Sequence, residues 1–254
     1  MTVAALGVYA AYYGDGGLFE VVADGLYAYH GTLNYGTHEV EVKKLRILNA
    51  IYELGAAAVR FGEYGWINPL VNRTYQASEG YGFASWVREC QVLASQTHQF
   101  GEHEHGMAIS TALAEIREHP ILRPDLPGDC DPEGDDDAKR VYDHVLNSLC
   151  GFDYLYCVCV YAAGEGAAGA YPACIYFKPE RVNTAIAGVF GNGGKGVHEL
   201  LPDTDDEDIA DGLRKFLGLV ASEAMSHSPW VWYDSSGYVS QFLDAHPARD
   251  GSGN

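Results

Sequence analysis

Residues Gly25–Thr32 read GLYAYHGT, a short run of alternating bulky side chains that ends in the polar tip His30-Gly31-Thr32. Alternation of this kind is typical of a strand with one buried face. Two apolar segments, Val3–Tyr13 and Leu18–Ala23, precede this run, and the intervening sequence is rich in glycine. Asp24-Gly25 is a dipeptide that favours a two-residue β-hairpin. The sequence therefore predicts an N-terminal antiparallel β-meander.

The hydrophobic period changes after this meander. Between residues 42 and 59 apolar side chains recur at the three- and four-residue spacing of an amphipathic helix. Further helices are expected around 83–93 and 107–116, at Ala138–Leu149, and at Asp205–Glu223, whose acidic start suits the helix dipole. Tyr154–Tyr161 is a continuous β-branched and aromatic run instead, and Ala173–Phe177 follows it. A second pair of strands is therefore predicted near 154–177.

These elements together predict the fold class α+β, with the helices packed on the N-terminal meander and the second strand pair beside them. The chain has 254 residues, which is enough for one large domain. A stretch near 120–137 is rich in proline and aspartate. We interpret it as a solvated connector or insertion within a single domain, 1–254.

Composition narrows the classes of function. The chain has 35 acidic and 16 basic residues and a formal net charge of −19. A field of that sign repels phosphate, so no direct nucleic-acid binding by a basic face is expected, whereas a protein partner is compatible with it. No apolar run approaches the roughly 18 residues of a membrane span, and no secretion signal is recognised. We expect a cytoplasmic protein with reduced, mostly buried thiols and no membrane association. In the strand-like run, Cys157 and Cys159 would point to one face.

Two motifs favour structural interpretations. Gly191-Asn-Gly-Gly-Lys-Gly196 has the letters of a dinucleotide-binding turn, but no helical period follows it, so a hairpin turn is expected. The histidines His98, His103 and His105 could bind zinc, yet flanking glycines favour an exposed loop, and no metal is expected. The acids between Asp203 and Asp208 are interpreted as the favourable residues of a helix N-terminus.

A strand ending in Tyr29-His30-Gly31-Thr32, followed by a helix ending in Leu54-Gly55, resembles the NAD-binding core of ADP-ribosyltransferases of the His-Tyr-Glu class. Gly80-Tyr81-Gly82-Phe83-Ala84 is similar to the glycine-flanked aromatic turn of that family. The resemblance implies NAD as the cofactor, with an imidazole on the ribose, an aromatic ring on the nicotinamide and a late glutamate, Glu165 or alternatively Glu180. The implied catalytic residues are His30, Tyr81 and Glu165, and the implied cofactor-binding residues are His30, Gly31, Thr32 and Phe83.

Two rival hypotheses come from other classes of function. The acidic charge, the 18 tyrosines and the aromatic C-terminal region are typical of a non-catalytic binding or assembly protein, such as an immunity-type inhibitor or a particle subunit. A zinc-dependent enzyme that uses the loop from His98 to His105 is the third possibility. Bound NAD, a captured partner and stoichiometric metal would distinguish the three.

Overall fold

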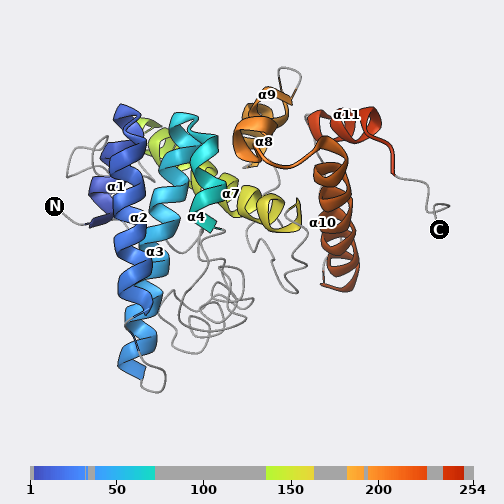
Figure 1. Cartoon of the computed structure of the whole chain (residues 1–254). Helices are drawn as coiled ribbons and strands as arrows, with labels where there is room; N and C mark the ends of the chain where they lie inside the picture. The colour runs from blue at the N-terminus through green and yellow to red at the C-terminus, as the bar shows by residue number, and fades with distance from the viewer. Residues whose placement is uncertain are drawn as a thin grey trace.

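The computed structural model describes residues 3–31, 33, 38–71, 136–162, 182–191, 194–227 and 237–248, and every regular element in these ranges is helical (Figure 1). The elements are α1 (Val3–Tyr13), α2 (Gly16–Gly31), α3 (His38–Phe61), the 3-10 turn η1 (Tyr64–Trp66), α4 (Ile67–Val71), α7 (Asp136–Ala162), α8 (Asn183–Phe190), α9 (Lys195–Leu200), α10 (Asp206–His227) and α11 (Tyr238–Ala245). The α+β prediction is therefore wrong for the described part of the chain, which contains no sheet.

A helical hairpin, α1–α2, stands where the β-meander was predicted. Gly14 turns the chain with a φ of 66°, which glycine adopts without strain. Asp15 then caps α2, because its Oδ1 accepts a hydrogen bond of 3.0 Å from the backbone N–H of Leu18. Asp24-Gly25 lies on the exposed face of α2 and forms no hairpin. The buried side chains of α2 recur at helical spacing: Phe19, Val22, Ala23, Leu26 and Tyr27.

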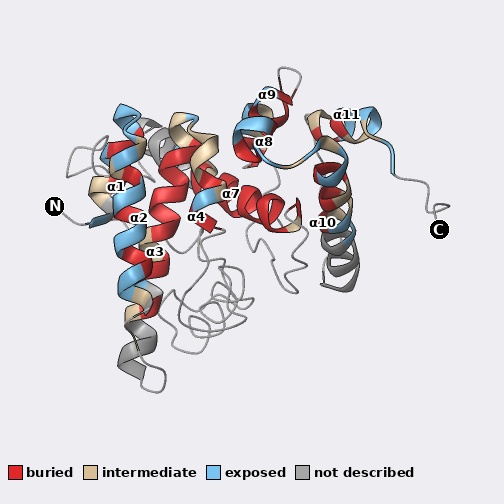
Figure 2. Cartoon of the chain, in the orientation of Figure 1, coloured by how far each residue is buried: buried red, intermediate tan, exposed pale blue. Residues whose placement is uncertain are grey.

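Helix α7 forms the centre of the core (Figure 2). It packs against α3, α4, α8 and α10, and every residue from Ser148 to Val160 is buried. A helix enclosed on all sides is apolar at nearly every position, so it lacks an amphipathic period and resembles a buried strand in sequence. For this reason the strand predicted at Tyr154–Tyr161 is wrong. Its predicted partner, Ala173–Phe177, lies outside the described residues.

The helices predicted at 42–59 and Asp205–Glu223 are confirmed as α3 and α10, and the one predicted at Ala138–Leu149 is the first half of α7. The predictions at 83–93 and 107–116, and the connector as far as residue 135, lie outside the described residues. The buried thiols predicted from the sequence are confirmed for Cys150, Cys157 and Cys159. Because residues two apart on a helix do not share a face, the prediction that Cys157 and Cys159 point the same way is wrong.

The glycine-rich segment at 191–196 joins two helices and is not the predicted hairpin turn. Gly194, with a φ of 79°, is the N-cap of α9. A Cβ atom placed on Gly196 would lie 2.7 Å from the Cα atom of Val189, so glycine allows α9 to contact α8 closely. Among the helices that the structure describes, none combines the length and the apolar character needed to cross a membrane.

Candidate binding surface

The structure places His30 in the last turn of α2 and not at the end of a strand. Its side chain is partly buried, and this burial, together with the nearby positive charge of Lys44, lowers the pKa of His30 to about 4. The ring is therefore neutral at physiological pH. Gly31 is the last residue of the same helix.

The other residues of the NAD-site prediction cannot be assembled around His30, because Thr32, Tyr81, Phe83 and Glu165 lie outside the described residues. The loop from His98 to His105 lies outside them as well. Within the ranges that are described, no group of three potential metal ligands converges. The NAD site and the zinc site stay predictions, and the strand on which the NAD site was based is absent.

Polar side chains are also buried where α3 and α7 meet. The Tyr52 hydroxyl donates a hydrogen bond of 2.7 Å to Oδ1 of Asp153, and both residues are buried. The ring of Tyr52 meets that of Phe152 edge to face, with 5.1 Å between the centroids. The pKa of the Cys157 thiol is raised well above its ordinary value, and burial is the largest cause. The thiol therefore stays protonated. A buried, protonated thiol is a poor nucleophile, and these side chains serve the packing of α3 on α7.

We expect Tyr52→Phe to lower the free energy of unfolding by about 2 kcal/mol, because the buried Asp153 side chain loses a hydrogen-bond donor that no solvent replaces. Urea denaturation at neutral pH measures the loss. Tyr12→Phe is the matched control, since Tyr12 is 62% exposed. Equal stabilities of the two variants would contradict a structural role for the buried bond.

The exposed surface differs in composition from this core. On α1 three tyrosines, Tyr9, Tyr12 and Tyr13, are 56%, 62% and 63% exposed, and we call these three residues the tyrosine patch. Tyr9 and Tyr13 share a hydrogen bond of 3.3 Å between their hydroxyl oxygens, and their ring centroids are 4.6 Å apart. Tyr12 meets Tyr13 edge to face, at 4.9 Å. The rings therefore form one contiguous aromatic surface.

The tyrosine patch is held in place from one side by the end of α3. The Tyr12 ring lies 5.4 Å from that of Phe61, centroid to centroid, and the guanidinium of Arg60 lies over the Phe61 ring at 5.7 Å. The hydrogen bond with Tyr9 is the largest cause that raises the pKa of the Tyr13 phenol, so the phenol remains neutral at physiological pH. The patch thus presents aromatic rings and hydroxyl groups at the surface.

Two acidic residues lie at the α1–α2 turn, next to the end of α1 that carries the tyrosine patch. Asp15 follows it directly at the α1–α2 turn, and the carboxylate of Glu63 lies against Gly14, where a Cβ would be 3.6 Å from Oε1. Residues 3–31 contain three acids and neither lysine nor arginine. The total of 18 tyrosines does not by itself locate this surface. The positions 9, 12 and 13 have the three- and four-residue spacing that would have placed them on one helix face, had α1 been recognised as a helix.

Comparisons of this chain with protein-family models, with curated proteins and with solved structures find no match.

Proposed function

We propose that this chain is a non-catalytic binding protein that receives a basic segment of a partner protein on the tyrosine patch. The observation that carries the proposal is the contiguous set of exposed rings on α1, beside acidic groups, on a chain with a net charge of −19. Isolated apolar side chains are common on protein surfaces, whereas three adjacent exposed aromatic rings favour an interaction site.

The chemistry of the patch selects the partner. Tyrosine faces attract lysine and arginine side chains through cation–π contacts, and the guanidinium of Arg60 over Phe61 already shows this geometry at the edge of the patch. Asp15 and Glu63 add attraction for a second cation. An acidic or nucleic-acid partner would instead meet the repulsion of the whole chain. A basic, partly apolar peptide segment satisfies both the rings and the charge.

Two synthetic helical peptides with the same leucine face, one carrying arginine and the other glutamate, test this proposal by calorimetric titration. We expect the arginine peptide alone to bind, with an affinity that falls as salt is added. In the double variant Tyr9→Ala/Tyr13→Ala, the affinity is expected to fall at least about tenfold. Both side chains are mostly exposed, so the fold is expected to tolerate their removal.

The control variant is Val21→Ala, which removes a 67% exposed apolar side chain from α2 and is expected to leave the affinity unchanged. Equal binding of the two peptides, or an unaltered affinity in the double variant, would refute the proposal. Light scattering measures whether the chain self-associates through the patch. Self-association that is abolished by the double variant would assign the patch to a second copy of the chain.

The proposal also places the protein in the cytoplasm, where buried thiols such as Cys157 remain reduced.

A further inference from the structure

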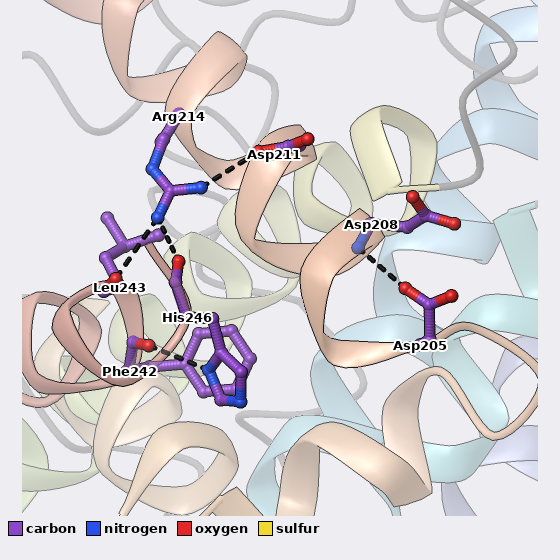
Figure 3. A network of polar contacts seen from close by, with 7 residues as sticks. All are labelled: Asp205, Asp208, Asp211, Arg214, Phe242, Leu243 and His246. Carbon is purple, nitrogen blue, oxygen red and sulfur yellow. Dashed lines mark hydrogen bonds and ion pairs between the residues drawn. The ribbon is translucent and has the colours of Figure 1, made fainter. Parts of the chain in front are cut away.

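Hydrogen bonds made by side chains differ in what they hold together. Figure 3 shows Arg214 of α10 donating to the carbonyl oxygen of Leu243 at 3.1 Å and to that of His246, so these bonds attach the end of α11 to α10. The hydrogen bond between Tyr9 and Tyr13 joins two exposed residues of one helix, α1. It does not attach one helix to another, and its significance lies in the chemistry of the two phenols.

The two phenols lie with their hydroxyl-bearing edges together. Tyr9 and Tyr13 are four residues apart on α1 and therefore share one face of the helix. The Tyr9 hydroxyl donates to the Tyr13 hydroxyl oxygen at 3.3 Å, the ring centroids are 4.6 Å apart, and the ring planes are inclined by 47°. In each ring the ortho carbons adjoin the carbon that carries the hydroxyl group. Ortho carbons of the two rings are therefore also close to each other.

This arrangement is close to that of two phenols joined by a carbon–carbon bond between their ortho positions. In such a biaryl the two hydroxyl groups flank the new bond side by side, and the two rings are twisted out of one plane. Tyr9 and Tyr13 already have adjacent hydroxyl oxygens and inclined rings. Forming the bond therefore requires rotation of the side chains and little movement of the α1 backbone.

Both phenols are accessible to an oxidant in solution, since Tyr9 is 56% and Tyr13 is 63% exposed. Cys150, Cys157 and Cys159 are buried thiols. Oxidation of a thiol depends on its exposure and on its thiolate character, and burial opposes both. An oxidant therefore meets the rings of the tyrosine patch before it meets these three thiols.

We propose that Tyr9 and Tyr13 form a modification site, at which a one-electron oxidant of the peroxidase class, supplied with hydrogen peroxide, joins the two rings as an intramolecular dityrosine. Each phenol loses one electron and one proton and becomes a phenoxyl radical. The two radicals form a carbon–carbon bond between their ortho carbons, and the two ortho hydrogen atoms then leave as protons while the two oxygens regain protons. The two electrons and two protons removed in all reduce one hydrogen peroxide to two water molecules.

The geometry favours this pair over the third ring of the tyrosine patch. When Tyr13 is oxidised, the Tyr9 hydroxyl can still donate to its oxygen and so stabilises the radical. Tyr12 meets Tyr13 edge to face, at an interplanar angle of 90°, and packs on Phe61. Side chains of adjacent helix residues do not face each other, so Tyr12 and Tyr13 are poorly placed to couple. Proximity within α1 also makes coupling of Tyr9 with Tyr13 faster than coupling between separate chains.

Oxidation of the full chain by a haem peroxidase and hydrogen peroxide tests the site. Cleavage on the amino side of Asp15 then releases peptide 1–14, whose only tyrosines are those of the tyrosine patch. We expect this peptide to be lighter by two hydrogen atoms, to show dityrosine fluorescence, and to yield no fragments from cleavage between residues 9 and 13 in mass spectrometry. The yield is expected to be independent of protein concentration, because the link forms within one chain.

Tyr9→Phe and Tyr13→Phe are each expected to lower the yield of the linked peptide at least about tenfold, because the remaining phenol has no partner hydroxyl held beside it. Tyr12→Phe is the matched control and is expected to retain the link. All three changes keep an aromatic ring at an exposed position, so the fold is expected to tolerate them. Coupling of free tyrosine in a parallel sample shows that the oxidant is active.

Three results would overturn the proposal: an unlinked peptide 1–14 under an active oxidant, a link that survives Tyr9→Phe, or covalent dimers of the chain in place of the internal link. The reaction requires no partner protein, and the arginine-peptide titration requires no oxidant. The modification site and the binding function of the tyrosine patch can therefore fail independently of each other.

Discussion

Gly55→Ala is expected to destabilise the protein by about 3 kcal/mol, although alanine is the better helix former by about 1 kcal/mol. Gly55 lies inside α3, where a Cβ atom would be 2.2 Å from two ring carbons of Phe152 on α7. The ring has little freedom to move, because it packs on Tyr52 and Tyr156 and is itself fully buried. The clash therefore outweighs the gain in helix propensity, and thermal unfolding is expected to shift downward by about 8 °C.

Gly25→Ala is the matched control for this prediction. Gly25 also lies inside a helix, α2, but a Cβ atom at this position would meet nothing within 4 Å. Only the propensity difference remains, so this variant is expected to gain up to about 1 kcal/mol. Parallel calorimetric scans of the two variants measure both shifts. A gain in stability for Gly55→Ala would show that α3 and α7 do not approach each other as closely as the structure places them.

These two glycines also illustrate what the sequence could and could not predict. Asp24-Gly25 has the composition of a hairpin turn, but the buried residues on either side follow the three- and four-residue spacing of a helix. That spacing is present in the sequence of α2, and the burial of these side chains outweighs the local turn preference of Asp24-Gly25. Gly55 suggested a helix end, because nothing in a single sequence reveals that an aromatic ring from another helix occupies the space beside it.

For α7 the sequence itself is ambiguous. A fully enclosed helix and a fully enclosed strand both require a continuous apolar run, so Leu155–Tyr161 fits either structure. The helices with one solvent-exposed face, α3 and α10, were predicted because their polar and apolar residues alternate with the helical period. The candidate binding surface was missed for a related reason. Tyr9, Tyr12 and Tyr13 form one surface only if α1 is helical, and an apolar segment with little periodicity was interpreted as a strand.

The charge of Glu53 leads to a further expected result: Glu53→Gln should stabilise the protein by about 3 kcal/mol near pH 8 and have little effect near pH 4.5. Glu53 lies on α3 and is 8% exposed, and burial raises its pKa from 4.5 to about 7. Between these values the folded state holds more protons than the unfolded state, so wild-type stability falls as pH rises through this interval. Glutamine carries no charge, so the variant lacks this pH dependence of stability.

Urea denaturation at a series of pH values measures the difference between the two proteins. Glu20→Gln, which removes an exposed carboxylate from α2, is the control and should run parallel to the wild type. Parallel profiles for Glu53→Gln and the wild type would contradict a raised pKa for Glu53.

The shape of the Glu53→Gln profile adds a second check, because His30 acts in the opposite direction. The pKa of His30 is lowered from 6.5 to about 4, so the folded state holds fewer protons than the unfolded state between these values. The His30 contribution to stability therefore rises with pH in this interval, whereas that of Glu53 falls. In the wild type the two slopes oppose each other between about pH 4.5 and 6.5, and without Glu53 the rising slope is expected to emerge. Its loss in Glu53→Gln/His30→Asn would assign that slope to the partly buried imidazole of His30 on α2.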